Sequence, residues 1–102
     1  MYIVVFVTTK DKREAEKIAQ KLIEEKLAAC ANIVDGVQSI FWWKGKVDQS
    51  NEALMILKSK EELLEKIILT VKALHSYTVP EVIALPLLDG NPDYLKWIEE
   101  SV

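Results

Sequence analysis

The order of apolar and polar residues divides the first quarter of the chain into a strand and a helix. The segment from Tyr2 to Thr8 is an apolar run rich in β-branched residues, which is typical of a buried strand. From about Asp11 to Lys26, charged residues separate apolar ones that recur at helical spacing, namely Ala15, Ile18, Ala19, Leu22 and Ile23. This spacing predicts an amphipathic helix with one buried face.

The middle of the chain has a period of two and predicts a β-hairpin. Leu27 to Ile33 alternates, Asp35-Gly36 is expected to break or bulge the strand, and the strand resumes from Val37 to Trp43. Lys44-Gly45 is a candidate for the tight turn, because glycine accepts the positive φ that hairpin turns require. A second strand is expected from about Glu52 to Lys58.

The next segment predicts a second helix. Ser59-Lys60-Glu61-Glu62 has the sequence of a capping box, in which Ser59 is the N-cap and Glu62 reaches back to it. The helix that follows is expected to bury its apolar positions, which are Leu64, Ile67, Ile68, Val71 and Leu74.

The C-terminal part predicts one more strand and a short helix. Val82 to Leu88 is the last apolar strand, and Pro86 places that end at a sheet edge or a bulge because proline has no backbone donor. Asn91-Pro92-Asp93 is a good helix start. The terminal helix is expected to carry an apolar group of Tyr94, Leu95, Trp97 and Ile98.

The predicted order is therefore β-α-β-β-α-β followed by a terminal helix. Right-handed crossovers place two helices on one face of a four-stranded antiparallel sheet. The fold class is α+β and ferredoxin-like, with a short C-terminal helix and a long central hairpin, in a single domain spanning residues 1–102.

The hairpin is long for so small a domain. If Ala28 to Trp43 is nearly one strand, it extends roughly 50 Å at about 3.3 Å per residue. Ordinary strands have about five or six residues. Because a small monomer cannot cover such a ribbon, we expect the hairpin to pair with other copies of the chain.

Composition excludes several classes of protein. The 102 residues, half of them apolar and 28% charged, fit one globular domain rather than a disordered chain. The net charge of −3 argues against a nucleic-acid partner. No apolar run reaches the roughly 18 residues of a membrane span, and the N-terminus lacks a basic leader region. With a single cysteine, which cannot form an internal disulfide, these features predict a cytoplasmic protein.

The cluster Phe41-Trp42-Trp43 places aromatic rings on both faces of its strand. Large aromatic side chains bury about 150–250 Å² each and anchor subunit interfaces. We therefore interpret the three residues as an interface, with plain core packing or a ligand pocket as alternatives.

Candidate metal chemistry depends on two residues, since the chain has one histidine, His75, and one cysteine, Cys30. Cys30 lies among small residues, where it is either a buried small hydrophobe or a metal or redox group without a CxxC partner. His75 falls on the apolar side of its helix, four residues after Val71. It either binds the last helix carbonyls or serves in ligation or proton transfer.

Glu81 is a carboxylate at the entrance to the last strand, where Pro80 holds the preceding backbone extended. Tyr77 adds a nearby hydroxyl. Neither residue belongs to a known catalytic signature, and the sequence has none of the common nucleotide-binding, zinc-protease or nucleophile-elbow motifs. An enzyme that uses His75 and Glu81 is kept only as an alternative.

Several segments together resemble the divalent-cation tolerance (CutA) proteins over essentially the whole chain. They are Leu27-Ala28-Ala29-Cys30-Ala31-Asn32, Phe41-Trp42-Trp43-Lys44-Gly45-Lys46 with Glu52 and Leu57-Lys58 downstream, Leu74-His75-Ser76-Tyr77-Thr78-Val79-Pro80-Glu81, and the ending Asp93-Tyr94-Leu95-Lys96-Trp97.

This resemblance implies a tight homotrimer in which long hairpins pair between subunits, as in PII-type signalling proteins. It also implies binding of copper or another divalent metal ion, with Cys30, His75 and, more weakly, Glu81 as ligands. Some members have two further soft donors, which this chain replaces by Val7 and Leu74. One chain therefore offers at most two soft ligands.

Our leading interpretation is a non-enzymatic, cytoplasmic homotrimer that binds divalent metal ions and takes part in tolerance of them. In this interpretation the protein has no organic cofactor and no nucleic-acid or membrane partner. The alternative is a PII-like trimeric regulatory module that binds a small ligand or a partner protein in clefts between subunits.

Overall fold

The computed structural model describes residues 1–102 and contains four strands and three α-helices. In chain order they are β1 (Tyr2–Thr9), α1 (Lys12–Glu24), β2 (Cys30–Trp43), β3 (Lys46–Lys60), a 3₁₀ turn (Glu61–Leu63), α2 (Leu64–Leu74), β4 (Val82–Pro86) and α3 (Pro92–Ser101). No helix is both long and apolar enough to cross a membrane.

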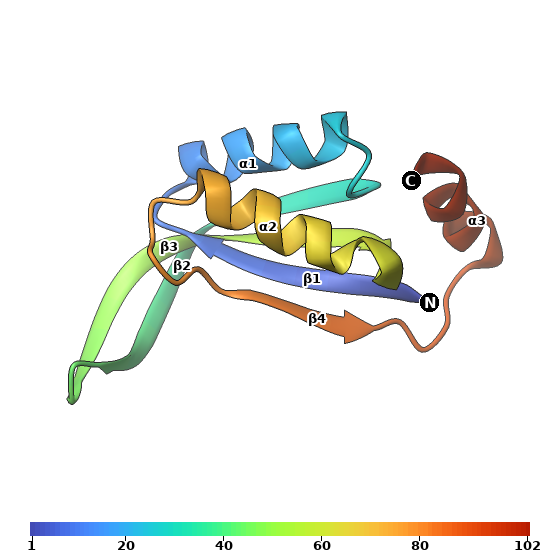
Figure 1. Cartoon of the computed structure of the whole chain (residues 1–102). Coiled ribbons are helices and arrows are strands. Elements are labelled where there is room, and N and C mark those ends of the chain that lie inside the picture. Colours follow the sequence, from blue (N-terminus) through green and yellow to red (C-terminus); the bar gives the residue numbers. More distant parts are fainter.

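The strands form one antiparallel sheet in the order β2-β3-β1-β4. Helices α1 and α2 cover one face of it, and α3 lies beyond the end of the sheet where β1 begins (Figure 1). This arrangement confirms the predicted ferredoxin-like α+β fold with its additional C-terminal helix.

The hydrophobic core lies between the two helices and the sheet. Alternate residues of β1 are buried against the helices, as expected for a strand with one covered face. The fully or nearly fully buried core residues come from β1, α1, β3, α2 and the segment before β2, and they are Ile3, Val5, Val7, Ala15, Ile18, Ala19, Leu22, Leu27, Ala28, Ala53, Met55, Leu57, Ile67 and Val71.

Several local predictions are confirmed. The β2–β3 register shifts between Val34 and Val37, where Asp35-Gly36 was expected to bulge. Lys44 and Gly45 have φ values of 49° and 78° and form the tight turn. Pro86 is the last residue of β4, which is an edge strand. Asn91 caps α3 by accepting a hydrogen bond from the Asp93 N–H.

The predicted bounds of the second strand of the hairpin are wrong. The strand was expected from Glu52 to Lys58, but β3 runs from Lys46 to Lys60. Residues 46–51 are mostly polar, so they carry little hydrophobic strand signal. The tight turn and the ladder with β2 nevertheless hold them in register up to the turn itself, as the pair Trp43 and Lys46 shows.

The predicted capping box is also absent. Ser59 is buried inside β3 opposite Ile3, and its hydroxyl donates to the carbonyl of Leu27 at 2.6 Å. The 3₁₀ turn after Lys60 has no side-chain cap, and α2 begins only at Leu64. Pairing with β1 extends the strand through the positions that a cap would need, and this outweighs the local preference of serine.

Other boundaries differ by a few residues. The strand expected from Leu27 begins at Cys30, because Leu27 and Ala28 turn into the core first. The strand expected to reach Leu88 ends at Pro86. In α2 only Ile67 and Val71 are fully buried, because the outer side of that helix faces away from the sheet.

The hairpin extends beyond the core as an arm, defined here as residues 37–52. Thr9, the last residue of β1, pairs with Ala53, so the arm has no strand neighbours other than its own two strands. Figure 1 shows the arm curving away from the body of the molecule. The predicted long hairpin is confirmed, and residues 37–52 of it extend past the end of β1.

Lys26 allows a test of the local structure, because it lies two residues after the end of α1 with a φ of 56°. The left-handed region is unfavourable for a residue with a Cβ atom and suits glycine. We expect Lys26→Gly to raise the free energy of unfolding by about 0.5–1 kcal/mol in denaturant titrations at fixed protein concentration. Lys17→Gly, on the exposed side of the same helix, should lower it by about 1 kcal/mol. A lower stability of Lys26→Gly would contradict this account.

Candidate functional site

His75 is held in one orientation at the end of α2. It is the C-cap residue of that helix, and its side chain is fully buried. Its Nε2 lies 2.7 Å from the carbonyl oxygen of Thr8, and its Nδ1 lies 3.0 Å from the backbone nitrogen of Tyr77. A carbonyl can only accept and a backbone N–H can only donate, so Nε2 carries the proton and Nδ1 is unprotonated. The imidazole is therefore neutral and uses both nitrogens within the protein.

Glu14, in the first turn of α1, holds the loop that follows His75. Its carboxylate accepts hydrogen bonds from the Ser76 N–H at 2.9 Å, the Ser76 hydroxyl at 3.1 Å and the Lys10 N–H at 3.2 Å. Burial opposes ionisation of Glu14, but these hydrogen bonds outweigh it, so the pKa of Glu14 lies below its ordinary value. Glu14 Oε1 is 3.8 Å from His75 Nδ1, which is unprotonated, so this contact is not an ion pair.

Tyr77 connects the same loop to β3. Its hydroxyl donates to Glu52 Oε2 at 2.7 Å, and its ring lies against the His75 imidazole at a centroid distance of 4.7 Å. Burial and the hydrogen bond to Glu52 raise the pKa of Tyr77 well above its ordinary value. Glu52 is only 8% exposed, which is unusual for a carboxylate.

Sequence reasoning missed the roles of Glu14 and Glu52. Asp11 and Glu14 have the spacing of a capping box, and Asp11 Oδ1 does accept a hydrogen bond from the Glu14 N–H at 2.8 Å. That pattern was a usable signal for a fixed Glu14. Glu52 had only the weaker signal of a charged residue directly before the apolar run of a strand.

Cys30 begins β2 and is partly buried. Its Sγ lies 3.9 Å from Lys58 Nζ and 3.8 Å from Asn32 Oδ1, and Lys58 Nζ also donates to Asn32 Oδ1. Tyr94 of α3 lies nearby, and burial together with the neighbouring Cys30 raises the pKa of the Tyr94 hydroxyl. The environment of Cys30 is thus polar on one side and formed by β3 and α3.

The structure does not bring Cys30 and His75 together. Cys30 is paired with Lys58 of β3, and Lys58 is paired with Val4 of β1. These side chains lie on the sheet face away from the helices. His75 binds the carbonyl of Thr8, four residues farther along β1 than Val4. Four residues of extended strand span about 13 Å. A single ion cannot contact both side chains of one chain.

Glu81 does not complete a site either. It is exposed directly before β4, and no hydrogen bond or ion pair joins it to His75. No group of three or more histidine, cysteine, aspartate or glutamate side chains is placed to hold a metal ion. The candidate ligands His75, Cys30 and Glu81 therefore do not form a metal centre within one chain.

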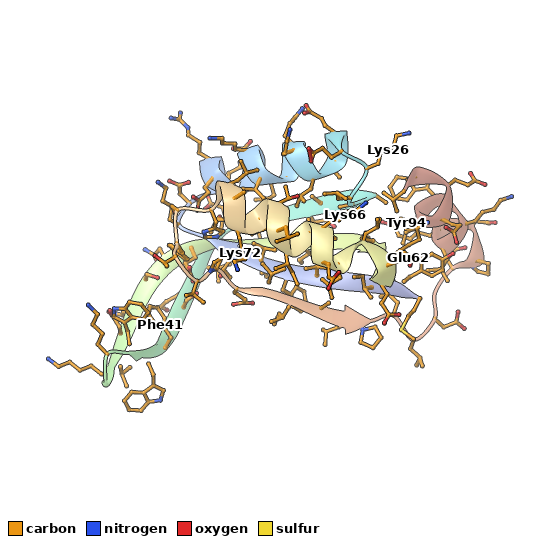
Figure 2. The ribbon with its side chains drawn as sticks, in the orientation of Figure 1. Lys26, Phe41, Glu62, Lys66, Lys72 and Tyr94 are labelled. Atoms are coloured by element: carbon orange, nitrogen blue, oxygen red, sulfur yellow. The ribbon has the colours of Figure 1, made fainter.

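The candidate interface residues are accessible. Phe41, Trp42 and Trp43 are 38%, 75% and 58% exposed. Their pairing partners show that Trp42 shares one face of the arm with Val47, while Phe41 and Trp43 lie on the other. Figure 2 shows Phe41 on the arm, far from Tyr94 on α3. With Trp42 on one face and Phe41 and Trp43 on the other, both faces of the arm present aromatic surface.

Two open cavities lie elsewhere on the molecule. One, of about 290 Å³, is on the arm and is lined by Gln38, Gln49, Ser50 and Asn51. The other, of about 370 Å³, lies between α1 and α2 and is lined by Glu25, Leu27, Lys66, Leu69 and Thr70. Neither cavity contains His75, Glu81 or Cys30, so neither supports a catalytic pocket built on these residues.

Comparison with known proteins gives a consistent result. The family model described as CutA1 divalent ion tolerance protein matches residues 3–101. The chain is 50% identical over 99 residues to "Protein CutA 1, chloroplastic" of Oryza sativa, covering 97% of this chain and 56% of that protein. It is 46% identical over 98 residues to "Divalent-cation tolerance protein CutA" of Thermus thermophilus, covering 96% and 95%. The chain thus spans about half the length of the plant relative.

Solved structures show the same similarity. The T. thermophilus divalent cation tolerance protein (Cut A1) superimposes with a TM-score of 0.97 at 46% identity, covering 99% of this chain and 98% of that one. The CutA1 structure from O. sativa superimposes with a TM-score of 0.96 at 50% identity, covering 98% and 92%.

The position of Glu14 predicts a pH dependence of stability. Its pKa is lowered on folding from an ordinary value of 4.5, so the unfolded chain binds the proton more readily. The stabilisation by Glu14 is present above that ordinary value and is lost as the pH falls through the folded pKa. We expect Glu14→Gln to lower the free energy of unfolding by about 1–2 kcal/mol at pH 7. The difference from the parent should shrink below about pH 4.

Chemical denaturation at several pH values measures this effect. Glu16→Gln, an exposed change on the same helix, is the control and should have little effect at any pH. A Glu14→Gln deficit that does not change with pH would show that the ionised carboxylate is not what stabilises the loop.

Proposed function

Because the chain belongs to the CutA1 divalent ion tolerance family, we propose that it is a non-enzymatic protein that binds copper or a similar divalent ion as a homotrimer. The arm carries this proposal, since a paired ribbon with aromatic residues on both faces lies outside the core of its own chain. The names of the relatives describe tolerance of divalent cations rather than a catalysed reaction.

The surface of one chain supports self-assembly. The sheet face away from the helices is apolar along two neighbouring strands, and Ile83 and Leu85 of β4 are about half exposed on it. The sheet also ends in two different free edges, β2 and β4. Pairing one kind of edge with the other is a head-to-tail contact, which gives a closed ring when the rotation closes. We propose three copies because the family resemblance implies a trimer.

The proposed metal site needs additional ligands, either from a second chain or from water. Copper prefers imidazole and thiolate donors, and this chain places its only two such groups apart. We therefore propose that His75, with Glu81 or with Cys30 of a neighbouring copy, contributes to a site of moderate affinity. The imidazole has to release the Tyr77 N–H or the Thr8 carbonyl before it can bind an ion.

No observation favours the alternative of a PII-like regulatory module. The relatives and solved structures described above are CutA proteins. The cytoplasmic location expected from the sequence stays a prediction.

The assembly can be tested by light scattering. We expect the parent protein to have about three times the mass of one chain at micromolar concentration. The double change Trp42→Ala and Trp43→Ala should shift it towards the single-chain mass, since truncating a buried aromatic costs roughly 3–5 kcal/mol. Trp97→Ala, which removes a ring of similar size from α3, is the control and should keep the parent mass. A single-chain mass for the parent would refute the trimer.

Metal binding can be tested by calorimetric titration with a copper(II) salt. We expect His75→Gln to remove most of the heat that comes from specific copper binding, because a glutamine amide is a poor copper ligand. The amide can still donate to the Thr8 carbonyl, which helps to keep the local structure. Cys30→Ser and Glu81→Gln show whether thiolate or carboxylate takes part. Circular dichroism of each variant checks that the fold is retained. The same copper isotherm for a folded His75→Gln and the parent would exclude His75 as a ligand.

A further inference from the structure

We propose that Tyr77 and Glu52 form a latch that fixes the base of the arm to the body of the molecule. His75 is a positioning residue for this latch and acts through Tyr77. The latch is a property of one chain, while its effect on assembly rests on the proposed homotrimer.

Glu52 lies at the point where the arm leaves the sheet. Ala53 is the last residue of β3 that has a partner in β1, and Glu52 is the next residue towards the tip. Its partner in β2 is Val37, which directly follows the bulge. A bulge bends its strand and increases the local twist, and two strands without a third neighbour are only marginally stable. The ladder alone therefore leaves the direction of the arm weakly determined.

The side chain of Glu52 supplies a contact at this point. It is 8% exposed, and the Tyr77 hydroxyl at 2.7 Å is its hydrogen-bond partner. A buried carboxylate is unfavourable unless it is hydrogen-bonded, and a hydrogen bond to an ionised group is stronger than a neutral one. Movement of the arm base away from Tyr77 would leave the carboxylate without that partner. The contact thus resists bending of the arm.

Tyr77 is itself held on the body side. Its N–H donates to His75 Nδ1, its ring lies against the imidazole, and His75 Nε2 donates to the Thr8 carbonyl of β1. The preceding Ser76 is bound by Glu14 of α1. The tyrosine hydroxyl is consequently connected to both β1 and α1. This gives the buried, neutral His75 a role that does not need a metal ion.

The arrangement makes the arm and the loop after α2 interdependent. The arm carries Phe41, Trp42 and Trp43, so its direction determines where these rings meet another copy. Neither Tyr77 nor Glu52 belongs to the hydrophobic core cluster. Loss of the latch should therefore release the arm without loosening the core, and this difference separates a latch from a general contribution to stability.

Hydrogen–deuterium exchange resolved by segment tests the proposal on the whole protein. We expect Tyr77→Phe, which keeps the ring against His75, to speed amide exchange in residues 37–52 about tenfold or more. Exchange in the core segments of β1 and α1 should stay at the parent rate. Glu52→Gln retains an oxygen acceptor for the Tyr77 hydroxyl and should have a smaller effect.

Tyr2→Phe is the matched control. It also removes a tyrosine–carboxylate hydrogen bond, from Tyr2 to Glu99 at 3.4 Å, but at the opposite end of β1. It should leave exchange in the arm unchanged. Equal exchange in the arm of Tyr77→Phe and the parent would overturn the latch, and so would acceleration spread evenly over core and arm.

Light scattering on the same samples separates this inference from the proposed function. A trimeric parent with a weakened Tyr77→Phe trimer supports both. A monomeric parent refutes the proposed assembly, while arm exchange still decides whether the latch exists. If the parent is trimeric, and Tyr77→Phe gives an equally stable trimer with unchanged exchange in the arm, the latch alone is refuted.

Discussion

The β2–β3 ladder is longer than the core that supports it, and much of the remaining structure follows from this mismatch. The strands contain 14 and 15 residues, whereas the neighbouring β1 has eight. The helices and β1 can bury only the half of the ladder next to them. The other half keeps its backbone hydrogen bonds but gains little from burial, so its apolar side chains stay exposed until another surface covers them.

The same mismatch explains why polar groups are buried at one end of the sheet. Where β1 ends, the next residue of β3 has lost its strand neighbour, and a side-chain network takes the place of the ladder. Glu52, Tyr77, His75 and Glu14 satisfy one another and the backbone there. No buried side-chain nitrogen or oxygen is left without a partner. Such a network is specific because each lost hydrogen bond would leave a buried polar group unsatisfied.

This network changes how the only histidine is understood. An imidazole that ligates a metal needs a free lone pair, and in His75 that lone pair accepts the Tyr77 N–H. The family name thus indicates divalent cations, whereas the geometry of one chain leaves His75 no free lone pair for one. The ligation proposed above requires an exchange of hydrogen-bond partners at His75. A purely positional role for His75 would leave the metal site to other residues.

The sequence by itself determined the fold class, the element order, the bulge at Asp35-Gly36, the turn at Lys44-Gly45 and the cap at Asn91. Each of these depends on residues close together in the chain, whose periodicity or backbone preference is visible locally. The tertiary structure alone decided that Ser59 stays in a strand rather than capping a helix, because β1 pairs with that segment. It also decided that β3 begins at Lys46, that Cys30 and His75 lie apart on the sheet, and that Glu14 and Glu52 meet the loop after α2. The start of β3 follows from the hairpin turn and its register, while the other outcomes depend on contacts between segments far apart in the sequence, which a local pattern of side chains does not specify.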